Sequence, residues 1–521
     1  MQLTMYMLRP GLPEDDWGLR ETIGEFVEVP TRPIGDLDLT VYLRQSRGNP
    51  PRWLRDLAPL VEEHDLSRLI NIHSAGVVLV RHHSHRFVLV FGTGRFALEP
   101  GAVQPGFGLR VVVNAVAAGR VISADTRELG GRGKSQRTAM STAGPLDELG
   151  IVPTKAWLRQ LEGRPPVEFA NAVSGSNSLK LNLRGFSLSK LEEKLDQIIE
   201  RYESSDYKKE YDFLDYFTRV EDKLTRDRLR ERLTDMLLEG SSDVSFASPD
   251  IEEPLEVEYY VLRHAGRRGT ELAELLADEV ITILAGCNTT DPLKDVRVEA
   301  YDSSGSRVGD NYRLLSYVVA DVELDGKRYA LSAGQWFVVD DDFVAKIDRA
   351  ISVIDDVTEQ LALEPWKLGA YPSEGDYNAR LAADRNWRLL DMQNFQLPAS
   401  YQKIEICDLL TEDKRLLCVK RMTRSSTLSH LFMQGQVSAQ LLTGNLEGYQ
   451  DRVMQDLALL NPTAAFGANS DWTFVYAIAT AKAGPLTSSL YFFSKVALYH
   501  AALQLRSLGV RVAVARIPME S

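Results

Sequence analysis

The last third of the chain alternates helical segments with short apolar runs, and this order constrains its fold most strongly. Helical composition or spacing is found in "SEGDYNARLAADRN", "SSTLSHLFMQGQVSAQLLTG" and "LYFFSKVALYHAALQLRSLG". Apolar runs typical of strands are found in "WRLLDMQNFQL", "KIEICDLL", "RLLCVKR", "DWTFVYAIATA" and "VRVAVARIP". The predicted order from Glu374 onward is helix, three strands, helix, strand, helix and strand, which indicates a mixed sheet flanked by helices.

The chain is too long, at 521 residues, to fold around one hydrophobic core. Its hydrophobic fraction of 44% and charged fraction of 26% are those of a soluble globular protein. Changes along the chain in charge content and in the spacing of apolar residues predict a mixed α/β (α+β) multidomain protein. The predicted regions are an N-terminal mixed α/β domain over 1–185, a helical connector over 186–300, a small α+β segment over 301–365 and a C-terminal domain over 366–521.

Several elements of the first two thirds are predicted from local patterns. A hairpin is expected over residues 76–91, "GVVLVRHHSHRFVLVF", and a second hairpin turn at Asp325-Gly326. A buried strand is expected in "FGLRVVVNAV". Helices are expected in "PPRWLRDLAPLV", in "TKAWLRQLEG", in "GTELAELLADEVITILAG" and over 342–363.

The composition and the sequence patterns also indicate the cellular compartment. No apolar run approaches the roughly 20 residues that a membrane span needs, so no membrane partner is expected. The N-terminus lacks the basic start, apolar stretch and cleavage site of a signal peptide. Three cysteines cannot build a disulfide framework or a four-thiolate zinc site. A cytoplasmic location is predicted.

The net charge of −13 argues against a protein that is coated in nucleic acid over its whole surface. It does not exclude a nuclease, because such an enzyme can confine its positive charge to one cleft.

The C-terminal order of elements resembles the core of the PD-(D/E)xK nuclease superfamily, which has a restriction-endonuclease-like fold. That superfamily places an acid on its second strand and an acid-x-lysine pair on its third. Asp408 takes the position of the first acid and Lys420 that of the lysine. The resemblance implies a nuclease that depends on Mg²⁺ (or Mn²⁺), with Asp408 as a catalytic metal ligand. Lys420 would position the attacking water and stabilise charge on the phosphate.

One position departs from the superfamily pattern. Cys418 stands two residues before Lys420, where the superfamily has an acid, and a neutral thiol is a poor Mg²⁺ ligand. Either another acid completes the metal site, or the site is weak or inactive. Glu374, on the preceding helix, is favoured; Glu405 faces away from Asp408 in a regular strand unless a bulge intervenes, and Asp391 is a third candidate.

The helix after this hairpin adds candidate nucleic-acid contacts. Gln434 would orient the substrate, as a glutamine on this helix often does in the superfamily. A helix N-terminus also favours phosphate binding. Taken alone each of these residues is more simply a surface residue, but together they predict a backbone-binding rim of Arg421, Arg424, Ser425, Ser426, His430 and Lys495.

The whole chain also resembles an uncharacterised bacterial group, the sporadically distributed proteins of mobile islands and candidate phage defence. The likeness is carried by "YALSAGQWF", "IEICDLL", "VKRMTRSSTLSHLFMQGQVSAQLL" and "FFSKVAL". It implies a defence effector that acts on DNA, or less readily on RNA, as a homo-oligomer and with a possible partner protein from the same locus. The alternative is a non-enzymatic nucleic-acid-binding or scaffold protein with a degenerate nuclease fold.

Two further patterns are given structural interpretations. His82, His83 and His85 are expected at a hairpin tip, with no acid close in sequence to complete a metal site. Cys407 and Cys418 lie on adjacent predicted strands and are interpreted as a buried core pair. A catalytic cysteine paired with His430 is a less favoured possibility.

Overall fold

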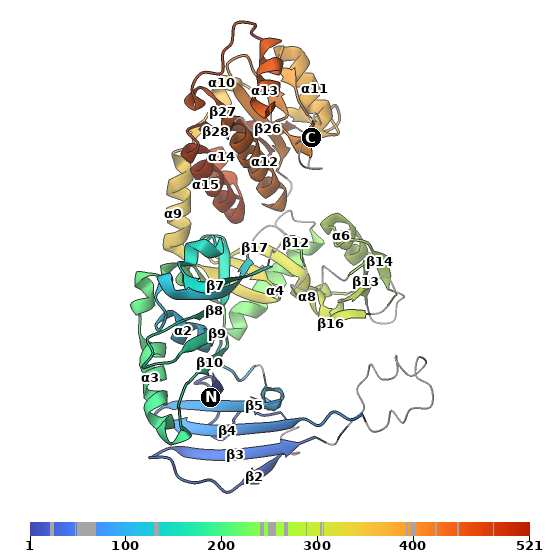
Figure 1. Ribbon diagram of the computed structural model, residues 1–521. Coiled ribbons are helices and arrows are strands. Elements are labelled where there is room, and N and C mark those ends of the chain that lie inside the picture. Colours follow the sequence, from blue (N-terminus) through green and yellow to red (C-terminus); the bar gives the residue numbers. More distant parts are fainter. Residues whose placement is uncertain are drawn as a thin grey trace, which may run out of the picture. The chain divides into compact units, whose positions relative to one another are not determined.

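The computed structural model (Figure 1) describes most of the chain. The described residues are 1–20, 26–46, 48, 69–99, 101–129, 135–239, 244–247, 257–264, 269–287, 289–302, 305, 307–391, 394–396, 403–422, 425–444, 448–482 and 484–520. They form two compact units. Unit 1 comprises Met1–Arg127, Gln136–Pro153 and Leu158–Leu214; unit 2 comprises Glu128–Ser135, Thr154–Trp157 and Asp215–Ser521. Helices and strands are mixed in both units, which confirms the predicted fold class.

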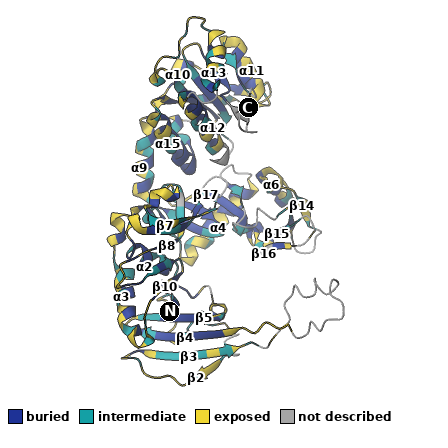
Figure 2. Cartoon of the chain, viewed as in Figure 1, coloured by how far each residue is buried: buried dark blue, intermediate teal, exposed yellow. Residues whose placement is uncertain are grey.

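Unit 1 is built around a ten-stranded sheet. Its strands, in spatial order, are β2 (Val27–Val29), β3 (Asp38–Gln45), β4 (Ser74–His82), β5 (His85–Gly92), β1 (Gln2–Met7), β10 (Ser178–Asn182), β9 (Ala172–Gly175), β8 (Ala156–Gly163), β6 (Val121–Glu128) and β7 (Ser135–Gly144). Its main helices are α2 (Phe107–Val113) and α3 (Leu191–Glu203). Figure 2 shows that burial decreases from β4 through β3 to β2 at the sheet edge.

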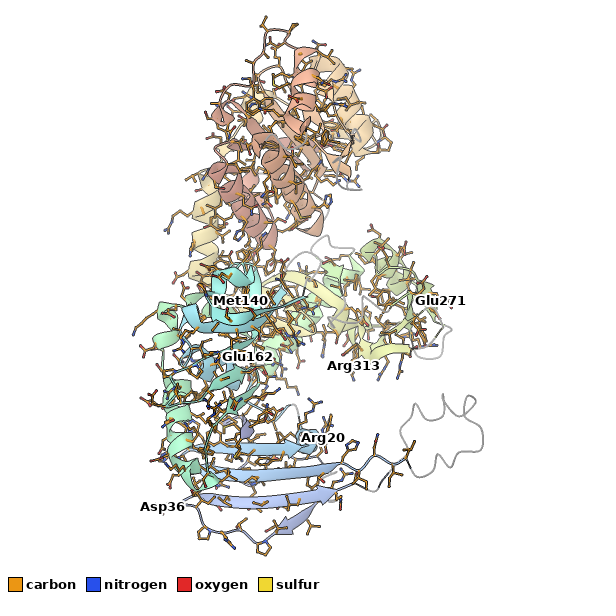
Figure 3. All side chains as sticks on the ribbon, viewed as in Figure 1. Arg20, Asp36, Met140, Glu162, Glu271 and Arg313 are labelled. Atoms are coloured by element: carbon orange, nitrogen blue, oxygen red, sulfur yellow. The ribbon has the colours of Figure 1, made fainter. Side chains whose placement is uncertain are left out.

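The predicted hairpin over 76–91 is confirmed as β4 and β5, which pair from Ala75↔Gly92 to His82↔His85. Two other predictions in this unit are wrong. The run "FGLRVVVNAV" forms α2 and not a strand, because a short fully apolar run fits either element and here packs as a helix against β9 and β10. The segment "TKAWLRQLEG" forms β8, whose hydrogen bonds to β9 override its local helical composition; its side chain Glu162 is labelled in Figure 3.

The first part of unit 2 contains two antiparallel sheets. One has the order β11 (Phe217–Arg219), β19 (Gln335–Val339), β18 (Lys327–Ser332), β17 (Val318–Leu324) and β12 (Val244–Phe246). The other has the order β14 (Thr270–Leu272), β13 (Tyr259–Arg263), β15 (Arg297–Tyr301) and β16 (Arg307–Arg313). The helices here are α4 (Lys223–Leu238), α6 (Ala277–Ala285), α7 (Pro292–Asp295), α8 (Leu314–Tyr317) and α9 (Asp341–Ser352).

The turn predicted at Asp325-Gly326 is confirmed between β17 and β18, with φ of 53° and 73° at its two residues. The helix predicted over 269–286 forms only in its second half, as α6, because Thr270–Leu272 pairs with β13. The helix predicted over 342–363 ends early at Ser352. It is followed by the short strand β20 (Asp355–Asp356) and the helix α10 (Thr358–Leu361). The predicted helix at 50–61 lies outside the described residues.

The C-terminal region follows the predicted order of elements, with an additional helix, α13, that was not predicted. Along the chain these are α11 (Glu374–Arg385), β22 (Arg388–Leu389), β25 (Leu409–Leu410), β26 (Arg415–Arg421), α12 (Ser425–Gly444), α13 (Tyr449–Ala458), β27 (Thr473–Thr480), α15 (Phe492–Ser507) and β28 (Arg511–Glu520). Strands β26, β27 and β28 are parallel, whereas β25 is antiparallel to both of its neighbours. One face of this sheet packs on α12 and α15 and the other on α11, so the sheet lies between helices.

Two of the predicted strands are divided. "WRLLDMQNFQL" gives β22 and then β23 (Asn394–Gln396), and "KIEICDLL" gives β24 (Lys403–Glu405) and then β25. Strands β23 and β24 pair with each other in a separate two-stranded sheet. The chain joins the main sheet only at Leu409, the first residue of β25. Glu405 and Asp408 are therefore not in one continuous strand, and the alternation of strand faces does not relate their side chains.

Helix α12 crosses β27 at a glycine. A Cβ atom added to Gly435 would lie 2.5 Å from the Tyr476 hydroxyl oxygen and 2.8 Å from its ring. That hydroxyl donates a hydrogen bond to the Phe432 carbonyl at 3.1 Å, and Tyr476 is fully buried. The glycine therefore sets the distance between helix and sheet.

We expect Gly435→Val to lower the free energy of unfolding by about 1–3 kcal/mol, because the added carbons overpack this contact. Gly369→Val is the matched control, since a Cβ there meets no heavy atom within 4 Å. Urea unfolding followed by circular dichroism measures both. Equal midpoints for the two variants would contradict the proposed contact.

Candidate active site

The candidate site is at the edge of β26. Strand β25 pairs with β26 only at Leu409↔Leu417 and Leu410↔Leu416. Beyond these pairs the Val419 N–H donates to Asp408 Oδ2 at 2.6 Å, and the Arg421 N–H donates to Glu374 Oε1 at 3.4 Å. Two carboxylates from different elements thus take the place of a neighbouring strand along this edge.

Asp408 is held by its backbone on both sides. Its N–H donates to the Leu417 carbonyl at 2.9 Å, and its own carbonyl accepts the N–H groups of Leu390 and Asp391 at 2.8 and 3.1 Å. The residue is 7% exposed. The backbone of this predicted metal ligand is therefore fixed in position directly before the short strand β25.

Glu374 is the first residue of α11, and the capping box of Ser373 and Asp376 fixes that helix end. Its Oε2 forms an ion pair with the Lys420 ammonium. The two side chains are 35% and 28% exposed, so the pair is reachable from solvent. The structure brings together two of the residues that the sequence assigned to one site.

Asp391 lies beside the same helix end. Its Oδ2 accepts a hydrogen bond from Asn378 Nδ2 at 3.1 Å, and a Cβ added to Gly375 would lie 3.4 Å from that oxygen. Asn378 is fully buried, and its Oδ1 has no hydrogen-bond partner in the described part of the chain.

Sequence reasoning missed Asn378. The available signal was a polar residue one helical turn after Glu374, next to the packing residue Tyr377.

Cys418 faces away from this edge. It and Cys407 are fully buried in the core beneath α12, which confirms that both are core residues, and neither is in a disulfide. Burial raises the pKa of Tyr449 and of Tyr476 in the same core. His430, in contrast, is exposed on α12, so the structure gives no support to a catalytic cysteine paired with it.

The remaining predicted residues are distributed differently. Lys495 is 4% exposed, and its ammonium is 2.7 Å from Asp348 Oδ1 on α9, so the structure does not bring it to the rim. Gln434 is half-buried on α12, and Arg421 is half-buried at the end of β26. Arg424 and the side chains of Glu405, Ser425 and Ser426 lie outside the described residues.

The three carboxylates of the edge do not meet at one point. Among the described residues, the one group of three ligand atoms within 4.8 Å of one another includes none of Glu374, Asp391 and Asp408. Mg²⁺ keeps several water ligands and is often held by only one or two carboxylates. A magnesium site at this edge would therefore need only one or two of these three acids.

The fold and the site define a mixed α/β protein with carboxylates and a lysine at the edge of a sheet. Residues 3–518 match a family of unknown function, DUF6119, and the chain belongs to this family. This agrees with the expected membership of an uncharacterised family over nearly the full length. No curated protein matches the chain. Within the described residues, none of the helices has the length and apolar character needed to span a bilayer.

Asp408 is expected to contribute to stability through its hydrogen bond to Val419. Asp408→Ala should lower the free energy of unfolding by about 1–3 kcal/mol, because it leaves a buried N–H without an acceptor. Asp408→Asn keeps an oxygen in place and should lose less. Thermal unfolding of both variants measures the difference, and an alanine variant as stable as wild type would show that this hydrogen bond is dispensable.

Proposed function

We propose that this chain is a Mg²⁺-dependent nuclease that acts on DNA in the cytoplasm, as an effector of antiphage or mobile-element defence. The observation that carries the proposal is that Asp408 and Glu374 each accept a hydrogen bond from a backbone N–H of the same edge of β26. Glu374 also forms an ion pair with Lys420 of that strand. The order α11, β22, β25, β26, α12, β27 supports it, because it follows the order in the PD-(D/E)xK core.

The donor atoms suit magnesium. Carboxylate oxygens are the ligands that this hard cation prefers, and an ammonium nearby suits a phosphate substrate. Asp408 and Glu374 would hold the ion, with Asp391 beside them. When bound, Mg²⁺ supplies Lewis-acid polarisation of the phosphate and lowers the pKa of a bound water.

The protein groups have separate roles in this proposal. The Lys420 ammonium already donates to Glu374 and would also face negative charge as it develops on the phosphate. Gln434 would orient the substrate. Arg421 lies beside the site, and Arg424, Ser425, Ser426 and His430 follow it in the chain as candidate contacts to the nucleic-acid backbone.

In this proposal Glu374 supplies the acid that the sequence pattern lacks at position 418. A carboxylate at position 418 would lie in an apolar core, where burial of a charge is strongly unfavourable. Glu374 reaches Lys420 from α11 instead. The enzyme proposal therefore depends on an acid that comes from a helix and not from the third strand.

The direct test is cleavage of supercoiled plasmid by the purified full chain with Mg²⁺ or Mn²⁺. We expect Glu374→Gln and Lys420→Met each to lower the cleavage rate by about 100-fold or more, because they remove transition-state charge stabilisation. The matched control is the Lys367–Glu520 pair, at 3.3 Å and more exposed. Lys367→Met and Glu520→Gln should leave the rate unchanged. Wild type that cuts no faster than the Glu374→Gln, Lys420→Met double variant would refute the nuclease.

One observation favours a second function, binding of nucleic acid without cleavage. The carboxylates of Asp408 and Glu374 both accept hydrogen bonds from backbone N–H groups of β26. Each therefore has a structural role at the strand edge that does not require a metal. In that case DNA binding should fall steeply with salt and survive Asp408→Asn, and Arg421→Ala should reduce the slope of log K against log salt by about 1. Fluorescence anisotropy at several salt concentrations measures this. An unchanged slope would exclude Arg421 as a phosphate contact.

A further inference from the structure

The tip of the β4–β5 hairpin in unit 1 carries three histidines. His82 ends β4, His85 begins β5 opposite it, and His83 occupies the turn with a φ of 51°. Neighbouring residues of a regular strand point to opposite faces. Here the turn brings the two adjacent rings together instead, with centroids 4.1 Å apart. The Nε2 atoms of His82 and His83 consequently face the same side.

A carboxylate from α3 meets both rings. Asp196 Oδ1 is 2.7 Å from His82 Nε2 and 3.2 Å from His83 Nε2, and these three atoms lie within 4.8 Å of one another. Figure 1 shows α3 beside the ends of β4 and β5 within unit 1. The sequence places no acid close to these histidines along the chain, and packing supplies an aspartate from more than a hundred residues away.

The spacing of these atoms suits a tetrahedral metal ion. Zinc bonds to nitrogen and oxygen of about 2.0–2.2 Å, at tetrahedral angles, separate the ligand atoms by about 3.4 Å. The observed separations from Asp196, 2.7 and 3.2 Å, are both shorter than this value, so the side chains would need to move apart by less than about 1 Å to admit the ion. His82 is 8% exposed, which holds one ligand in place, whereas His83 and Asp196 are 65% and 54% exposed and leave an entry path.

The surroundings favour a cation further. His85 Nε2 is 3.7 Å from Glu203 Oε1, and Glu203 lies two helical turns after Asp196 on α3. This second carboxylate adds negative charge along the same side of the helix. His85 itself is half-buried at the start of β5.

We propose that His82, His83 and Asp196 form a Zn²⁺ site that joins the β4–β5 hairpin tip to α3, with water completing the coordination. Two imidazoles and one carboxylate suit zinc and related transition metals better than Mg²⁺ or Ca²⁺. The competing interpretation is a hydrogen-bonded cluster in which both histidines donate to Asp196. The inference does not depend on the nuclease proposal, whose residues lie in unit 2.

The test is equilibrium dialysis of the chelator-treated full chain against Zn²⁺, with zinc measured by mass spectrometry. Wild type should bind one more zinc ion per chain than His83→Ala or Asp196→Asn. Loss of a direct ligand should weaken the site by more than the roughly 10–100-fold typical of an outer partner. His73→Ala is the matched control, since His73 is an exposed histidine of the same unit outside the cluster.

Two further readouts separate the site from other zinc binding. Zn²⁺ should raise the thermal midpoint of wild type and of His73→Ala, but not that of His83→Ala. Co²⁺ should give a visible spectrum without thiolate charge transfer, because the ligands are nitrogen and oxygen. Equal zinc content in wild type and His83→Ala, or equal midpoints with and without zinc, would leave only the hydrogen-bonded cluster. Plasmid cleavage with Mg²⁺ is measured in a separate assay, so the zinc proposal and the nuclease proposal can each be refuted without the other.

Discussion

The carboxylates that hydrogen-bond to the outer edge of β26 hold the C-terminal site together. An unpaired strand edge attracts other strands and leaves N–H groups without acceptors. Asp408 and Glu374 occupy that edge with oxygen atoms that other ligands can share. This arrangement accounts for three features of the site. Strand β25 is short, so the edge beyond it is open to the carboxylates. Helix α11 begins at Glu374, and Glu374 pairs with Lys420.

In the proposed nuclease, the same arrangement would allow Cys418 to replace the usual acid of the third strand. In the superfamily pattern both the acid and the lysine come from one strand, so strand geometry fixes their distance. Here the second acid comes from a helix end whose capping box fixes its start. The distance between Glu374 and Lys420 then depends on how α11 packs against the sheet, through residues such as Tyr377 and Leu381. A structural role and a catalytic role for Glu374 are compatible, because an exposed carboxylate has lone pairs for both an N–H group and a cation.

Local signals predicted much of the C-terminal fold and part of the site. Helices α11 and α12 and strand β26 follow from composition and apolar spacing. That Glu374 and Lys420 share one site was expected from the resemblance to the nuclease superfamily. Asn378 was missed because its environment depends on how α11 packs. The identity of α2 and β8 depended on tertiary partners, as did the meeting of Asp196 with His82, and neither kind of contact leaves a local pattern. Sequence alone therefore predicts which elements exist more readily than which distant side chains meet.

Unit 2 is not a continuous stretch of chain, and this affects when it can fold. Its aromatic core includes Leu129 and Trp157, and the Trp157 ring is 4.7 Å from that of Phe337. During synthesis these early segments leave the ribosome long before their partners in β19 and α15 exist. Their side chains therefore cannot be buried in this core until almost the entire chain has been synthesised. A fragment that starts at Asp215 would lack them from the beginning and would present an incomplete core to solvent.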